Sequence, residues 1–189
     1  MQFIDYVPLL LINMAAGLVL LAAYVAFGVH DARGRRWAPG FIMTGAVALA
    51  FGTHMALTWP LPGPYGAMFG EMTVLFGVIF LAAGLVLALG GDMVTVAGYA
   101  FFAGLAAVLL GVRIVVLSLT QLPLLSAAGF VLAGLGGVGA LPFYLWFRNN
   151  RVARVLAALV LLAAAGIWAL TGYLAYWIHP GMLSHWMPK

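Results

Sequence analysis

Residues 67–89 read AMFGEMTVLFGVIFLAAGLVLAL, an almost unbroken apolar run in which Glu71 is the single ionisable residue. About 20 apolar residues in a helix are enough to cross the hydrocarbon core of a bilayer. Because lipid offers the backbone no hydrogen-bond partner, such a segment has to be helical. The run therefore predicts a membrane-spanning helix, and the rest of the chain repeats its character.

Five more apolar segments, separated by short turns, are predicted to span the membrane at about 7–29, 37–57, 94–117, 124–147 and 152–178. Of the 189 residues, 66% are hydrophobic and only 6% are charged, and the mean hydropathy is +1.16. A soluble domain carries about a quarter charged residues. The predicted fold is all-α: a polytopic transmembrane bundle of six helices, with residues 1–189 as a single domain whose sequential helices are antiparallel neighbours.

Basic residues give this bundle a predicted direction. Six of the eight lie in two clusters beside apolar segments: Arg33, Arg35 and Arg36, and Arg148, Arg151 and Arg154. Positively charged loops stay in the cytoplasm, so both termini are predicted on the outer side of the inner (plasma) membrane of a prokaryote. Clusters this small do not form the broad basic face that nucleic acid needs, and we expect no nucleic-acid partner. The lipid bilayer is the expected surrounding.

The costly polar residues fall in the predicted outer half. His54, Glu71 and Arg113 lie one or two turns inside their spans, while His179 and His185 lie at or beyond the end of the last span. An ionisable group in a membrane span indicates function by default. A single histidine or arginine near a helix end also has a structural interpretation, as a packing or interfacial residue.

Taken together, these residues suggest a non-covalent b-type haem in the outer half. His54 and His179 are the predicted axial ligands, and Arg113 and Glu71 complete the predicted cofactor site, with Arg113 placed to pair with the propionates. The chain has no cysteine, which excludes covalent haem attachment and thiolate metal sites. The resulting hypothesis is a membrane haem protein for electron transfer or haem/quinol redox chemistry, with a quinol or redox partner and oxidoreductase activity as one option.

Two other functions remain open. Copper, which favours imidazole and thioether ligands, is predicted to bind His54, His179 and His185, with Met55, Met72 and Met182 as weaker candidates. A small-solute or ion transporter would use Glu71 and Arg113 as an outer-leaflet polar site. A purely structural subunit is a further interpretation. No hydrolase, phosphate-binding or zinc-protease motif is present, so no catalytic residue is assigned.

Small residues predict close helix contacts. Gly66 and Gly70 form a small-xxx-small pair, and the fifth span is rich in glycine. Such surfaces also favour a homo-oligomer. The six-span layout, the arginine clusters and the positions of His54, Glu71 and Arg113 resemble a family of small prokaryotic integral membrane proteins of unknown function. The resemblance covers nearly the whole chain and implies a membrane protein of this fold, without implying catalytic residues.

Overall fold

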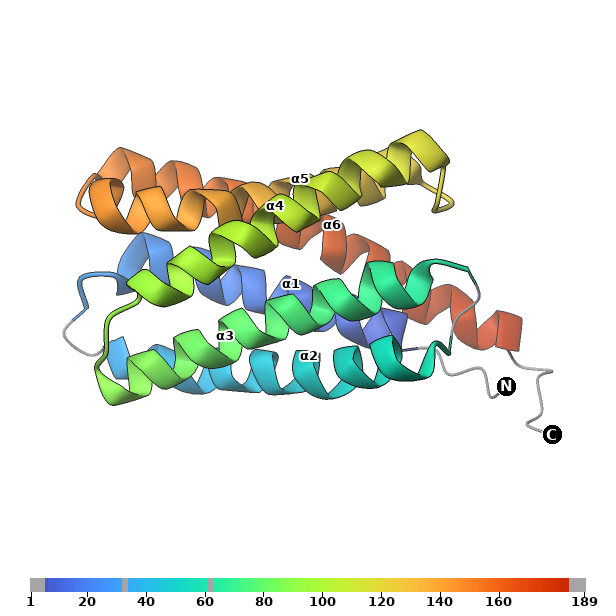
Figure 1. Cartoon of the computed structure of the whole chain (residues 1–189), viewed down its shortest axis with the longest axis horizontal. Coiled ribbons are helices and arrows are strands. Elements are labelled where there is room, and N and C mark those ends of the chain that lie inside the picture. The colour runs from blue at the N-terminus through green and yellow to red at the C-terminus, as the bar shows by residue number, and fades with distance from the viewer. Residues whose placement is uncertain (1–5, 32–33, 61–62, 184–189) are drawn as a thin grey trace.

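The computed structural model describes residues 6–31, 34–60 and 63–183. Within these ranges every regular element is helical and no strand occurs. The six long helices, drawn in Figure 1, are α1 (Val7–Ala23), α2 (Ala38–Thr58), α3 (Met72–Leu89), α4 (Val94–Leu117), α5 (Pro123–Pro142) and α6 (Arg151–Leu183). Each is long and apolar enough to cross a membrane, once the short helical turns adjoining four of them are included. The predicted bundle of six transmembrane helices is confirmed for the described part of the chain.

Short helical turns of a different geometry adjoin the long helices. Three are π-helical: η1 (Tyr24–Gly28) continues α1, η3 (Gly66–Glu71) precedes α3, and η4 (Phe143–Phe147) continues α5. A fourth, η2 (Gly34–Trp37), is a 3₁₀ turn before α2. A π-helical turn is rare, and it is frequently found at functional sites. The three π-helical turns therefore mark candidate functional positions.

Proline and left-handed residues set several helix ends. Proline stands in the first turn of α1, α2 and α5, where its missing N–H costs nothing. At the end of α3, Gly90 has a φ of 72°, which lets the chain turn directly into α4. The last helix is longer than predicted, since α6 runs through Pro180 to Leu183.

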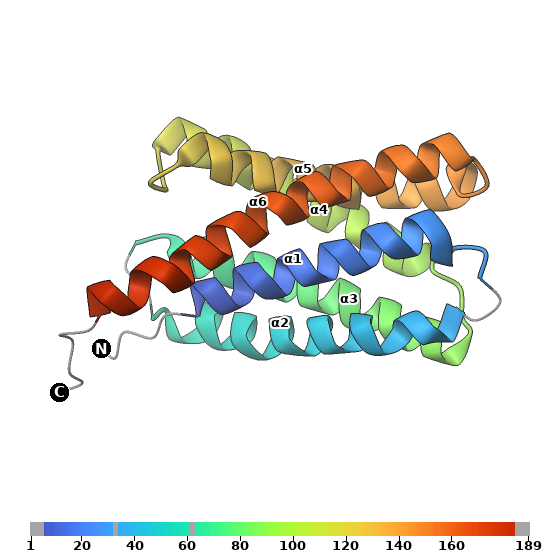
Figure 2. The same cartoon turned by 180° about the vertical axis from the view of Figure 1, so that it is seen from behind.

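The helices form a closed ring. Each helix packs against the one before it and the one after it, and α6 returns to pack along α1. Contacts are most extensive between α2 and α3, between α4 and α5, and between α1 and α6. The views in Figures 1 and 2 show α4 and α6 crossing the bundle obliquely, which brings the two halves of the chain together.

Glycines allow the closest of these contacts. A Cβ atom added to Gly77 of α3 would lie 2.8 Å from the backbone nitrogen of Leu49, and one added to Gly84 would lie 2.8 Å from that of Ile42. Both partners belong to α2, so the two helices touch through their backbones. Gly70, Gly77 and Gly84 are spaced by seven residues, as are Gly45 and Gly52 on the facing helix. We predicted that these sequential helices are neighbours, but not that glycines at a spacing of seven form their contact.

The two ends of the bundle differ in charge. At one end, which we call the arginine end, the α1–α2 and α5–α6 connections carry Arg35, Arg36, Arg148 and Arg151. The two connections touch there, because Nε2 of His30 is hydrogen-bonded to the Arg148 carbonyl oxygen at 3.2 Å. At the other end, which we call the terminal end, α1 begins and α6 finishes (Figure 1). The side of the membrane on which the arginine end lies stays a prediction.

Candidate functional site

A large cavity lies in the middle of the helix ring. Its volume is about 420 Å³, and all six helical segments contribute to its wall, α2 through Phe41 alone. It begins at Met14 and Met72, on the side of the terminal end, and extends to Val29 and Met93 at the arginine end. We call it the central cavity. Because residues of all six helical segments line it, the cavity lies along the axis of the bundle.

The wall is almost entirely apolar. Its described lining consists of leucine, valine, isoleucine, methionine, phenylalanine, alanine and glycine, with two exceptions, Tyr24 and Tyr144. No charged side chain is among the described lining residues. An ion entering such a space loses its hydration without gaining a partner, at a cost of at least several kcal/mol. The cavity therefore favours uncharged molecules.

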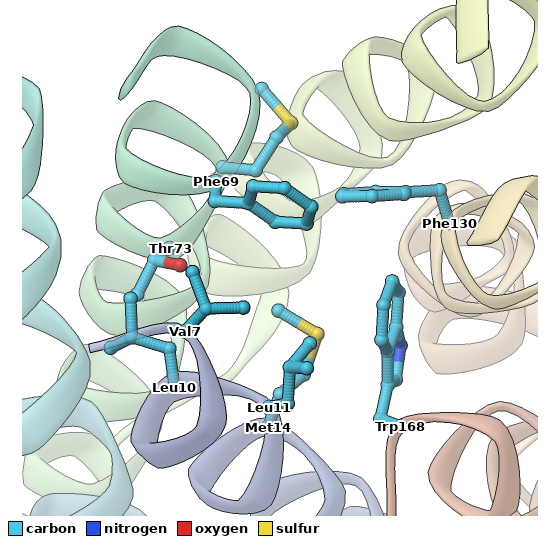
Figure 3. Close-up of a pocket in the computed structure, with 9 residues that line it drawn as sticks. Val7, Leu10, Leu11, Met14, Phe69, Thr73, Phe130 and Trp168 are labelled. Carbon is cyan, nitrogen blue, oxygen red and sulfur yellow. The ribbon is translucent and has the colours of Figure 1, made fainter. Parts of the chain in front are cut away.

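Aromatic side chains close the cavity toward the terminal end. The ring centroids of Phe69 and Phe130 are 6.1 Å apart, and those of Phe130 and Trp168 are 5.0 Å apart with nearly perpendicular planes. Figure 3 shows these rings with Leu11 and Met14 among the residues around a small void. The volume of this void is about 10 Å³. A void of this size holds no more than about one water molecule. We call Leu11, Met14, Phe69, Phe130 and Trp168 the aromatic plug.

The plug and the central cavity share a boundary. Met14, Met72 and Phe130 line both the small void and the large cavity. Phe130 and Trp168 are 3% and 2% exposed, so these rings are packed and leave no continuous opening past them. The space along the bundle axis is thus open within the central cavity and filled by side chains at the plug.

The arginine end of the cavity carries the two tyrosines. The hydroxyl of Tyr144 donates a hydrogen bond to Oδ2 of Asp92 at 3.1 Å, and Oδ1 of Asp92 accepts one from the first backbone N–H of α4 at 2.7 Å. The guanidinium carbon of Arg148 lies 4.7 Å from the centroid of the Tyr144 ring. Tyr24 packs edge-on against Trp37 and Phe41, with ring centroids 6.0 and 5.7 Å away.

The π-helical turns lie at both ends of the cavity. Tyr24 is the first residue of η1 and Tyr144 lies in η4, both at the arginine end, while η3 supplies Phe69 to the plug. The α-helical geometry is thus interrupted at both ends of the central cavity, at the segments that carry Tyr24, Tyr144 and Phe69. We did not predict these turns, because the sequence has no recognised signal for them.

The described lining of the central cavity does not include four of the residues predicted from sequence: His54, Glu71, Arg113 and His179. His54 is exposed at the terminal end of α2, with Nδ1 hydrogen-bonded to the Tyr6 hydroxyl at 2.5 Å. The Thr58 hydroxyl donates to the carbonyl oxygen of His54 at 2.7 Å. Met55, next to it, is fully buried in the packing around Tyr6 and Leu10. His54 therefore has a structural environment that sequence alone did not show.

Glu71 and Arg113 are not brought together. Both are exposed, and in the described part of the chain neither forms an ion pair; the ion pair that is present joins Arg36 to Asp31 at 2.9 Å. His179 is partly buried and has contacts of its own near the end of α6. Met72 lines the central cavity. His185 and the side chain of Met182 lie outside the described residues.

The chain is similar to a known protein family and to a solved structure. Residues 1–181 match a family described as protein of unknown function (DUF981). No curated protein matches the chain. The solved structure of the Helicobacter pylori urea channel in its closed state is similar to this chain, with a TM-score of 0.64 at 15% sequence identity, over 95% of this chain and 99% of that chain. At this identity the likeness is one of fold.

The hypothesis of a membrane haem protein for electron transfer is wrong. No group of three or more His, Asp or Glu side chains in the described residues is placed to hold a metal, and the fold resembles a channel. A haem needs space beside its ligand, whereas the described part of the central cavity wall contains no histidine. The predicted quinol or redox partner and the optional oxidoreductase activity depended on the haem. These predictions are therefore not retained. Haem b and copper as ligands of the terminal-end residues stay untested sequence predictions.

Proposed function

The chain belongs to the DUF981 family, whose function is unknown, and we propose from its geometry that it is a channel for small uncharged solutes. The observation that carries the proposal is the central cavity: about 420 Å³ of space along the axis of a ring of six helices, with no charged residue in its described lining. The sequence left a haem protein, a copper protein, a small-solute or ion transporter and a structural subunit open, and the small-solute transporter is the one we retain.

The chemistry of the wall supports uncharged solutes over ions. An apolar wall gives no compensation for a desolvated charge, while a small neutral molecule loses much less on leaving water. The fold likeness to a protein described as a urea channel supports the same class. Urea and acetamide are suitable probes because both are small, uncharged and able to form hydrogen bonds.

The aromatic plug accounts for how such a path is kept shut. Phe69, Phe130 and Trp168 come from three different segments, η3, α5 and α6. A small shift of one segment relative to the others separates the rings, since the Phe69–Phe130 and Phe130–Trp168 contacts each join two different segments. Opening therefore needs no rearrangement of the whole ring.

The cellular setting is also part of the proposal. We place the protein in the plasma membrane of a prokaryote, with the arginine end in the cytoplasm, on the strength of the positive loops. Exposed apolar side chains cover the outer surface of the ring, among them Leu109, Leu124 and Trp177. This surface fits lipid and is compatible with a homo-oligomer.

Flux through proteoliposomes tests the function. The reconstituted protein is expected to accelerate acetamide entry over protein-free vesicles in a stopped-flow swelling assay. Ala103→Phe, which fills the cavity from α4, is expected to abolish most of this flux. Leu109→Phe is the matched control, because Leu109 is on the same helix and 65% exposed. If the folded wild-type protein accelerates the entry of none of acetamide, urea and glycerol, the proposed channel function is wrong.

A further inference from the structure

Two hydroxyl groups stand out in an otherwise apolar wall. Tyr24 and Tyr144 are the polar side chains of the described cavity lining, and both lie at its arginine end. Each is held on a π-helical turn, η1 for Tyr24 and η4 for Tyr144. Two separate helices thus depart from α-helical geometry at the same level of the bundle, and each presents a tyrosine there.

The two hydroxyls differ in their partners. That of Tyr144 donates to Asp92, which leaves its oxygen able to accept a hydrogen bond. That of Tyr24 forms no hydrogen bond with any residue in the described ranges, although its ring is fixed against Trp37 and Phe41. A partly buried hydroxyl without a protein partner is stabilised by whatever polar molecule occupies the adjoining space. Among the described residues, the Tyr24 hydroxyl therefore has no acceptor for its proton.

The surroundings keep this pair near neutrality. Tyr24 and Tyr144 line the same end of the central cavity. Arg148 lies over the Tyr144 ring, and Asp92 is bound to the Tyr144 hydroxyl. One positive and one negative group flank the pair from outside the cavity, so the pair itself offers hydrogen bonds and no net charge.

We infer that the hydroxyls of Tyr24 and Tyr144 form a solute-binding subsite at the arginine end of the central cavity, for an uncharged solute that both accepts and donates hydrogen bonds. A primary amide or urea fits this description: its carbonyl oxygen accepts from Tyr24 while its N–H donates to the Tyr144 oxygen. This inference rests on the proposed channel function and specifies which solutes within the small uncharged class are preferred.

The packing explains why the subsite is selective. Phe41 and Trp37 on one side, and the Asp92 bond on the other, fix the two rings before a solute arrives. A fixed pair of hydrogen-bonding groups rejects a molecule that leaves one of them unpaired, because each unmet bond is a loss relative to water. Apolar molecules of similar size gain nothing there.

Acetamide flux in proteoliposomes tests the inference. Tyr24→Phe is expected to lower the flux roughly 3- to 10-fold, the effect of one lost hydrogen bond. Its melting temperature is expected to be unchanged, since the hydroxyl has no hydrogen-bond partner among the described residues. Tyr144→Phe is expected to lower the flux and also the melting temperature. The control is Tyr99→Phe on α4, where the tyrosine is 45% exposed and outside the cavity lining; it is expected to behave as wild type.

The outcomes separate the two proposals. Equal or faster acetamide flux in a folded Tyr24→Phe variant overturns the subsite and leaves the channel standing. Wild-type protein that accelerates the entry of none of acetamide, urea and glycerol overturns the channel, and the subsite with it; glycerol flux without acetamide or urea flux overturns the subsite alone. A fall in flux for Tyr24→Phe and none for Tyr99→Phe, at equal melting temperatures, supports both.

Discussion

Gly104 of α4 and Gly134 of α5 face each other with no room between them for a side chain. A Cβ atom on Gly104 would lie 2.5 Å from the carbonyl oxygen of Gly134, and one on Gly134 would lie 2.8 Å from that of Gly104. The two helices are in backbone contact, and both glycines also line the central cavity. The width of the cavity therefore depends on this contact.

Gly104→Ala is expected to destabilise the protein by about 1–3 kcal/mol, because the added methyl group forces α4 away from α5. Gly98→Ala is the matched control on the same helix, where an added Cβ would meet nothing within 4 Å. Thermal unfolding in detergent measures the difference. Equal melting temperatures for the two variants would contradict the backbone contact.

Phe130→Ala is expected to raise acetamide flux, since Phe130 separates the small void in the plug from the central cavity. The loss of a buried ring also costs about 3–5 kcal/mol of stability, so the variant has to be assayed below its lowered melting temperature. Phe102→Ala, at a position 73% exposed, is the control and is expected to leave flux unchanged. A folded Phe130→Ala protein with wild-type flux would show that the plug does not limit passage.

Tyr6→Phe is expected to lower stability by roughly 0.5–1.5 kcal/mol through loss of its hydrogen bond to His54, with acetamide flux unchanged. His54→Ala removes the same bond, so the double variant is expected to be less destabilised than the sum of the two single variants. Melting temperatures of the four proteins complete the cycle. Lost flux in a His54→Ala protein of normal stability would instead restore the terminal end as the functional site.

The arginine end is expected in the cytoplasm. The native chain has no cysteine, so single-cysteine variants carry no background. Asn149→Cys places a thiol in the exposed α5–α6 connection at the arginine end, and Gln121→Cys places one in the exposed α4–α5 connection at the terminal end. A membrane-impermeant maleimide added to intact cells is expected to label Gln121→Cys alone. The reverse pattern would invert the topology.

The sequence was a reliable guide to the helices and a poor one to the site. Runs such as 67–89 have to be helical in lipid whatever they pack against, so their number and approximate limits follow from composition. His54, Glu71 and Arg113 drew attention because a polar residue in an apolar run is conspicuous. The structure gives His54 a partner in Tyr6 and leaves Glu71 and Arg113 exposed, which no local pattern indicates.

The sequence did not indicate that Tyr24 and Tyr144 line a cavity. Each looks like an ordinary interfacial tyrosine when read along the chain, because aromatic residues are common at membrane boundaries. Their role as the hydroxyl groups of the cavity wall depends on two helices that are far apart in sequence and on π-helical turns in both. The spacing of seven between glycines on α3 was a sequence signal for its close backbone contact with α2.

By itself the sequence determined that this protein is a bundle of six apolar helices in a membrane, because the bilayer imposes length, apolarity and helical hydrogen bonding on each segment independently. Only the tertiary structure decided that α6 closes onto α1, that the ring keeps a cavity of about 420 Å³, and that aromatic rings shut it at one end. A cavity is space between segments, and its shape follows from which faces meet rather than from the composition of any one of them.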